Sequence, residues 1–167
     1  MIYFDNAATG GFKPNAVLDT TLTTLKYLSA NPGRSGHRLS VSGVKRVLET
    51  REVLSNFFSC ALERVVFTKN CTEALNLAIF GTLKKGGHVI TTTHEHNSVL
   101  RPLYYLESLN LITLSVVSPT KEDIEKAFTA QTYLVVCTAV SNVTGEVLPL
   151  DDIKSLCKEK EIGRAHV

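Results

Sequence analysis

The chain has 167 residues, of which 44% are hydrophobic and 20% are charged. That length and composition are sufficient for one buried core, so a single domain is expected. The formal net charge is only +2, and no basic run is interleaved with aromatic residues, which argues against a nucleic-acid-binding protein. No apolar stretch is long enough to cross a bilayer, so no membrane segment is expected.

The N-terminus and the cysteines bear on cellular location. The opening residues, MIYFDNAATGG, carry neither a basic region nor a long apolar region, so they do not resemble a signal peptide. The four cysteines are widely spaced and form no CxxC pair, which argues against a zinc ribbon or a disulfide framework. A cytoplasmic protein with reduced thiols is expected.

The last six residues, 162–167, read Ile-Gly-Arg-Ala-His-Val. The codons of a widely used sequencing adapter encode the same six residues. Our hypothesis is that the reading frame passes from native DNA into adapter near Glu161. Residues 162–167 are therefore treated as a non-native tail and left out of the fold argument.

The first third of the chain carries two helical patterns separated by a turn. Apolar residues recur at helical spacing over residues 14–28 and again over residues 40–58. Residues 31–36, Asn-Pro-Gly-Arg-Ser-Gly, are typical of a loop. Ser40 is placed to cap the second helix.

Beyond residue 64, short apolar runs that are typical of buried strands alternate with helical patterns. Strands are expected over residues 65–68, 88–92, 111–117 and 133–137. Helices are expected over residues 72–83, 98–108, 121–129 and 150–160, with Pro102 in the first turn of its helix and Thr120 as a cap. This alternation predicts an α/β fold with a mostly parallel sheet flanked by helices.

Ligands of such sheets bind beyond the carboxyl ends of the strands. The first predicted strand runs directly into a helix at residues 69–74, where unpaired backbone N–H groups and the Thr72 hydroxyl would suit a phosphate. Taken alone, this segment is more simply explained by Thr72 as an N-cap and by Cys71 as a small buried apolar residue. No Walker motif is present, so a nucleoside triphosphate is not expected.

His94 and His96 follow the second predicted strand and, in extended chain, would point the same way. Two metal ligands are one explanation, but a third ligand at suitable spacing is not evident. The alternatives are an imidazole packed on an aromatic ring, or a surface or capping histidine.

Asn142, after the last predicted strand, either hydrogen-bonds a ligand oxygen or belongs to a turn before Gly145. Together, a phosphate site, a stacking imidazole and an amide suit a flat phosphorylated heterocycle.

Five motifs, in order, resemble those of cysteine desulfurases in the class V aminotransferase family, which have the fold type I of pyridoxal-phosphate enzymes. They extend over essentially all of residues 2–160. The motifs are Tyr3–Thr9, Asn31-Pro32 with His37, Phe67–Asn76, Glu95–Leu100 and Val140–Gly145.

The resemblance implies roles for four residues toward pyridoxal 5′-phosphate. Thr72 and the backbone at Cys71 would bind its phosphate. His96 would stack on its ring and assist proton transfer in catalysis. Asn142 would contact the ring hydroxyl and the substrate carboxylate.

The resemblance also implies a substrate and partners. Asn6, Ala7 and His37 would line the substrate side. The activity would be removal of sulfur from L-cysteine to give alanine and an enzyme persulfide, by a homodimer that passes sulfur to an acceptor protein. A selenocysteine lyase or another class V aminotransferase remains the alternative.

The same resemblance shows which catalytic groups this chain lacks. The family's aspartate at the pyridine nitrogen, its cofactor-binding lysine and its sulfur-accepting cysteine all lie further along. None of the four cysteines here matches that nucleophile. Residues 1–161 would then be the N-terminal portion of the large domain, and the 167-residue chain alone is expected to be inactive. A metal-binding module built on His94 and His96 remains a third, different class of function.

Overall fold

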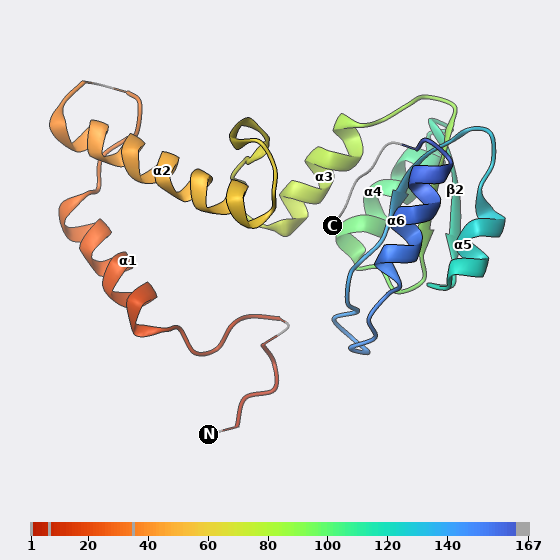
Figure 1. The fold of residues 1–167 in the computed structure, drawn as a ribbon, viewed down its shortest axis with the longest axis horizontal. Coiled ribbons are helices and arrows are strands. Elements are labelled where there is room, and N and C mark those ends of the chain that lie inside the picture. Colours follow the sequence, from red (N-terminus) through yellow and green to blue (C-terminus); the bar gives the residue numbers. More distant parts are fainter. Residues whose placement is uncertain (1, 7, 35, 163–167) are drawn as a thin grey trace. The chain divides into compact units, whose positions relative to one another are not determined.

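The computed structural model describes residues 2–6, 8–34 and 36–162. The chain forms two compact units, residues 1–67 and residues 68–167, and each is considered by itself. Figure 1 shows the first unit in red to yellow and the second in green to blue. No helix in the described ranges is long and apolar enough to cross a membrane.

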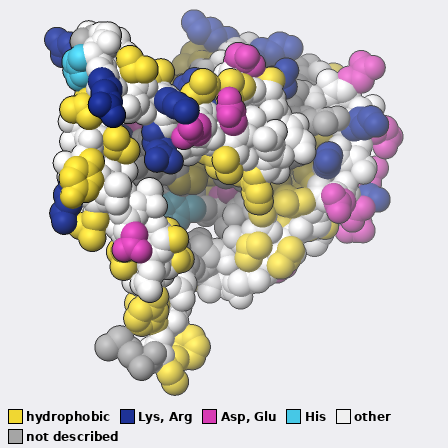
Figure 2. All heavy atoms as spheres, turned by 60° about the vertical axis from the view of Figure 1, so that its left-hand side comes forward, with side chains coloured by type: hydrophobic (Ala, Val, Ile, Leu, Met, Phe, Trp, Pro, Cys, Tyr) yellow, Lys and Arg dark blue, Asp and Glu magenta, His cyan; other side chains and the backbone are white. Residues whose placement is uncertain are grey.

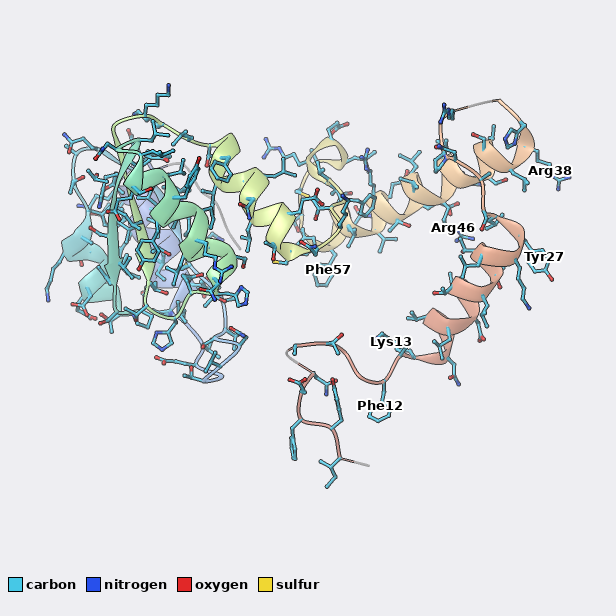
Figure 3. The ribbon with its side chains drawn as sticks, turned by 180° about the vertical axis from the view of Figure 1, so that it is seen from behind. Phe12, Lys13, Tyr27, Arg38, Arg46 and Phe57 are labelled. Atoms are coloured by element: carbon cyan, nitrogen blue, oxygen red, sulfur yellow. The ribbon has the colours of Figure 1, made fainter. Side chains whose placement is uncertain are left out.

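The N-terminal unit consists of helices that bury little of their own surface. Its elements are α1 (Asn15–Tyr27), α2 (Arg38–Phe57) and the short 3-10 helix η1 (Leu62–Arg64). The two predicted helices are confirmed, but α1 buries none of its residues and α2 buries only Ser40 and Ser55. Large apolar side chains such as Phe12, Tyr27 and Phe57 are about seven-tenths exposed or more (Figure 3). In the space-filling view of Figure 2, many exposed hydrophobic side chains lie among charged ones.

His37, not Ser40, caps α2, so the predicted cap is wrong. The backbone of His37 is extended, and its Nδ1 accepts a hydrogen bond from the Ser40 N–H at 3.2 Å. Ser40 lies inside the first turn, where its buried hydroxyl donates to the carbonyl oxygen of Asn31 at 2.9 Å. The Ser40 hydroxyl is therefore already used to hold the preceding loop.

The predicted strand over residues 65–68 is also wrong. These residues belong to no helix and no sheet, and Val66 and Phe67 are 68% and 48% exposed. A strand needs a neighbour for its backbone hydrogen bonds. The sheet in the described ranges contains only the three later strands, so residues 65–68 have no partner there.

The C-terminal unit is built on a parallel sheet, which confirms the predicted α/β fold. Its strands are β1 (Gly87–Thr92), β2 (Ile112–Val117) and β3 (Thr132–Val136), in the order β2-β1-β3. The central strand β1 pairs in parallel with both neighbours, so that Val89 lies opposite Leu114 and Leu134. All three carboxyl ends therefore lie at one edge of the sheet.

Helices cover both faces of this sheet, because successive side chains of a strand point to opposite sides. Val89 and Leu134 belong to one hydrophobic cluster, which α3 (Cys71–Gly81) and α4 (Asn97–Ser108) complete. Ile90 and Val135 belong to a second cluster with α5 (Lys121–Ala127) and α6 (Leu150–Glu159). Every residue of β1 is buried, as expected for a central parallel strand.

Two details of the helices test the predicted ends. Thr120 caps α5 as predicted, since its Oγ1 accepts from the Asp123 N–H at 3.2 Å. Pro102 lies in the second turn of α4 rather than the first, because α4 begins at Asn97. Proline has no N–H, so it removes one backbone hydrogen bond inside α4. Pro102 is buried, and the apolar surface that it removes from water works against this cost.

Candidate cofactor and substrate site

The segments that follow β1 and β3 line a common hollow at the carboxyl edge of the sheet. Its volume is about 340 Å³. It is lined by Thr93, His94, Glu95, His96 and Asn97 after β1, and by Ser141, Asn142, Val143 and Thr144 after β3. The structure thus brings His96 and Asn142 together, although they are far apart in the sequence.

His96 stands at the start of α4 and serves as its N-cap. Its Nδ1 accepts from the Ser98 N–H at 3.1 Å and lies 2.8 Å from the Ser98 hydroxyl. Because Nδ1 accepts a backbone N–H, the neutral ring carries its proton on Nε2. The cap fixes one ring nitrogen and leaves the exposed imidazole with a donor for a ligand.

His94 has a different partner, because the chain turns at residues 93–94 instead of staying extended. Its Nε2 lies 2.9 Å from Oε2 of Glu146. The expectation that His94 and His96 follow one another in an extended chain is therefore wrong. Within the described ranges, no three His, Cys, Asp or Glu side chains are grouped to hold a metal ion.

The Asn142 loop is shaped by its neighbours rather than by Asn142. An antiparallel bridge joins Val140 to Val147, and Gly145 turns the chain with a positive φ of 74°. The buried Ser141 Oγ accepts from the Thr144 N–H at 3.2 Å. The Asn142 side chain is exposed and has no hydrogen bond to another described residue, so its amide is available to a ligand.

Glu95 is a residue of this site to which the sequence patterns assign no role. It is only 9% exposed, and its Oε1 accepts from the Thr138 N–H at 2.5 Å and from the Thr92 hydroxyl at 3.1 Å. Burial raises the pKa of this carboxyl, against a lowering by those two hydrogen bonds and by His94. The sequence signal that could have identified Glu95 was an acidic residue between two histidines, directly after a predicted strand.

Cys71 and Thr72 lie at the first turn of α3 and are both exposed. The capping residue is Asn70, whose Oδ1 accepts from the Glu73 N–H at 2.9 Å, so Thr72 is not the N-cap. Cys71 is not a buried apolar residue either. The N–H groups of Cys71 and Thr72 have no acceptor among the described residues. Neither residue lines the hollow, although α3 packs beside α4 in the same hydrophobic cluster.

The residues expected on the substrate side belong to the other unit. Asn6 Oδ1 accepts from the Gly11 N–H at 3.1 Å, and His37 caps α2. Ala7 lies outside the described residues. Their place on the substrate side stays a prediction.

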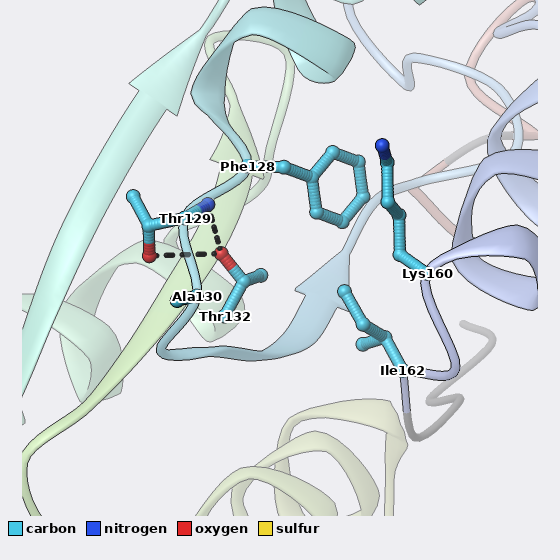
Figure 4. Close-up of a pocket in the computed structure, with 6 residues that line it drawn as sticks. All are labelled: Phe128, Thr129, Ala130, Thr132, Lys160 and Ile162. Carbon is cyan, nitrogen blue, oxygen red and sulfur yellow. Dashed lines mark hydrogen bonds between the residues drawn. The ribbon is translucent and has the colours of Figure 1, made fainter.

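A second hollow, of about 350 Å³, lies at the opposite end of β3 (Figure 4). Thr132, the first residue of that strand, lines it with Phe128, Lys160 and three further residues. The Thr132 hydroxyl is occupied, since it accepts from the Thr129 N–H at 2.8 Å. Ligands of parallel sheets bind at the carboxyl edge, so the first hollow is the candidate site.

Comparison with known proteins identifies the family. Residues 2–164 match the model of the class-V aminotransferase family. The chain belongs to that family. It is 30% identical to a protein of Borreliella burgdorferi named "Probable cysteine desulfurase", over 97% of this chain and 41% of the relative.

Two solved structures match the fold closely. A cysteine desulfurase from Thermococcus onnurineus has 29% identity and a TM-score of 0.86, over 96% of this chain and 42% of that one. The protein SspA, solved in complex with cysteine, has 27% identity and a TM-score of 0.89, over 99% of this chain and 50% of that one. The chain spans half or less of the length of these proteins.

Proposed function

We propose that the whole protein is a cysteine desulfurase that uses pyridoxal 5′-phosphate. It would break the carbon–sulfur bond of L-cysteine, leave alanine, and pass the sulfur to an enzyme thiolate as a persulfide. The observation that supports this most is the shared hollow of His96 and Asn142 at the carboxyl edge of the sheet, in a class-V aminotransferase chain.

The residues present suit a phosphorylated ring. The unpaired N–H groups at the start of α3, with the Thr72 hydroxyl, offer donors and the positive end of the helix dipole to a phosphate. The cap by Asn70 holds this turn open, because it satisfies the Glu73 N–H and leaves those of Cys71 and Thr72 free for a ligand. When bound, pyridoxal phosphate supplies the electron sink for chemistry at the substrate amine carbon.

His96 and Asn142 have separate tasks in this proposal. The His96 imidazole is held by its Nδ1, so that its face can stack on the ring and its Nε2 can hold or pass a proton. The free amide of Asn142 donates to the ring hydroxyl oxygen and to the substrate carboxylate. Asn6, Ala7 and His37 are proposed for the substrate side.

Further features of the proposal concern the whole protein. Its active form would be a cytoplasmic homodimer, with a separate protein as the final sulfur acceptor. SspA binds cysteine, which favours cysteine over selenocysteine as the substrate here. Residues 162–167 remain proposed as a non-native tail.

The test is a desulfurase assay on the whole protein supplied with pyridoxal phosphate and a thiol reductant, which reduces the enzyme persulfide and releases its sulfur as sulfide, with sulfide and alanine measured in parallel. We expect the two products in equal amounts. Asn142→Ala should mainly raise KM for cysteine, and His96→Ala should mainly lower kcat. Release of selenide from selenocysteine without sulfide from cysteine would instead favour a selenocysteine lyase. Absence of both activities would refute the proposal.

A further inference from the structure

We propose that Glu95 is a positioning residue that sets the spacing between His96 and Asn142. This inference rests on the proposed function, because it assigns a purpose to the distance between the two ligand-binding groups. Glu95 immediately precedes His96, and its carboxylate reaches across to the segment that leads from β3 to Asn142.

One oxygen atom makes the connection. Oε1 of Glu95 accepts from the Thr138 N–H at 2.5 Å and from the Thr92 hydroxyl at 3.1 Å. The Thr138 hydroxyl in turn donates to the carbonyl oxygen of Val140 at 3.0 Å. These bonds tie the end of β1, the start of α4 and the exit of β3 into one polar network beneath the hollow.

The burial of Glu95 indicates that this link has a purpose beyond packing. An apolar residue could fill the same space without the cost of removing a carboxylate from water. No lysine or arginine forms an ion pair with it in the described ranges. What the fold gains is an acceptor for the Thr138 N–H at the point where the chain leaves the sheet.

The geometry separates an acceptor role from a charge role. Both donors converge on Oε1, so a glutamine oxygen at the same position can accept both bonds. Aspartate keeps the charge, but its shorter side chain draws the acceptor away from Thr138. A positioning residue therefore tolerates Glu95→Gln and not Glu95→Asp, whereas a residue that works by charge or proton transfer shows the reverse order.

The experiment compares E95Q, E95D and wild type in the whole protein, with Glu125→Ala as an exposed glutamate control on α5. Three quantities are measured: hydrogen–deuterium exchange over residues 138–147, the dissociation constant of pyridoxal phosphate for apoprotein, and kcat and KM for cysteine. E95D should exchange faster over 138–147, bind the cofactor more weakly, and lose about 10- to 100-fold in kcat/KM, because small misplacements of ligand-holding groups cost that much. E95Q and E125A should match wild type in all three.

Each result has a definite meaning. Unchanged exchange and affinity in E95D would overturn the inference, as would loss of activity in E95Q with normal exchange. If the wild-type protein has no desulfurase activity, the proposed function fails. In that case the exchange over residues 138–147 still decides whether Glu95 positions the loop.

Discussion

His94 and Glu146 join the two segments that line the candidate site. Their Nε2 and Oε2 atoms are 2.9 Å apart, which connects the turn after β1 to the Asn142 loop. This link differs from the one through Glu95 because it is open to solvent, with side chains 23% and 54% exposed. Exposed pairs of this kind contribute about 0–1 kcal/mol, so its main effect should be on loop order rather than on stability.

We therefore expect Glu146→Ala to raise KM for cysteine by roughly two- to fivefold, the range that a coupling of up to about 1 kcal/mol allows. The free energy of unfolding should fall by less than about 1 kcal/mol. Steady-state kinetics and urea unfolding test this. The control is Asp152→Ala, which removes the exposed Lys121–Asp152 pair, 3.8 Å apart and away from the hollow. Equal KM changes in the two variants would show that the His94 link does not order the loop.

The cap of α3 gives a second prediction. Asn70→Ala removes the acceptor of the Glu73 N–H and should lower stability by about 1 kcal/mol. If the first turn binds the cofactor phosphate, fraying there should also weaken the affinity of apoprotein for pyridoxal phosphate. Thr120→Ala is a matched control, because it removes the same type of cap from α5. It should reduce stability similarly and leave the cofactor affinity unchanged; an equal loss of affinity would argue against a phosphate at α3.

The sequence predicted the framework of the C-terminal unit well, because periodicity reports on burial. Val89 and Ile90 lie on opposite faces of a fully buried strand, and the apolar run around them is sufficient to indicate it. The same reasoning failed for residues 65–68. An apolar run shows the tendency to be extended, but a strand also needs a neighbour to pair with.

The shared position of His96 and Asn142 was predictable, and the connections between their two segments were not. His96 and Asn142 could be placed at one edge because parallel strands align their carboxyl ends. The caps of α2 and α3 could not, since Ser40 and Thr72 are also good capping types and only the local backbone decides which side chain turns back. Glu95 was missed because its partner, Thr138, lies beyond the end of another strand and the bond uses a backbone N–H that no side-chain pattern reveals.

His88 makes stability depend on pH. It is 4% exposed in β1, with Nδ1 2.8 Å from the Thr132 hydroxyl and Nε2 2.9 Å from the Ser115 hydroxyl. Burial lowers its pKa below the ordinary value of 6.5. At a pH between the folded-state and the unfolded-state pKa of His88, the unfolded chain binds more protons than the folded one. The stabilising contribution of the neutral His88 is therefore complete above pH 6.5 and is lost as pH falls through the folded-state pKa of His88.

His88→Gln should therefore reduce stability at pH 8 by about 1–3 kcal/mol, because it leaves at least one of the Thr132 and Ser115 hydroxyls without its imidazole partner. Between pH 7 and pH 5 the variant should lose less stability than wild type. Urea unfolding at a series of pH values measures both effects, and all other titrating groups cancel in the difference. Parallel pH curves for the two proteins would show that His88 does not titrate on unfolding.

The cysteines should differ sharply in reactivity, since the thiolate is the reactive form. Burial, with the negative charges of Glu95 and Cys157 nearby, raises the pKa of Cys137 to about 12. Cys71 is exposed at the first residue of α3, where a bound phosphate would cover it.

Iodoacetamide at pH 8 should therefore alkylate Cys71 in the native protein and Cys137 only after unfolding. Pyridoxal phosphate should slow the reaction at Cys71. Peptide mass spectrometry over time measures each rate, and Cys71→Ser should abolish the native-state reaction at that peptide. Rapid alkylation of native Cys137 would contradict its burial, and a Cys71 rate unaffected by cofactor would place the phosphate elsewhere.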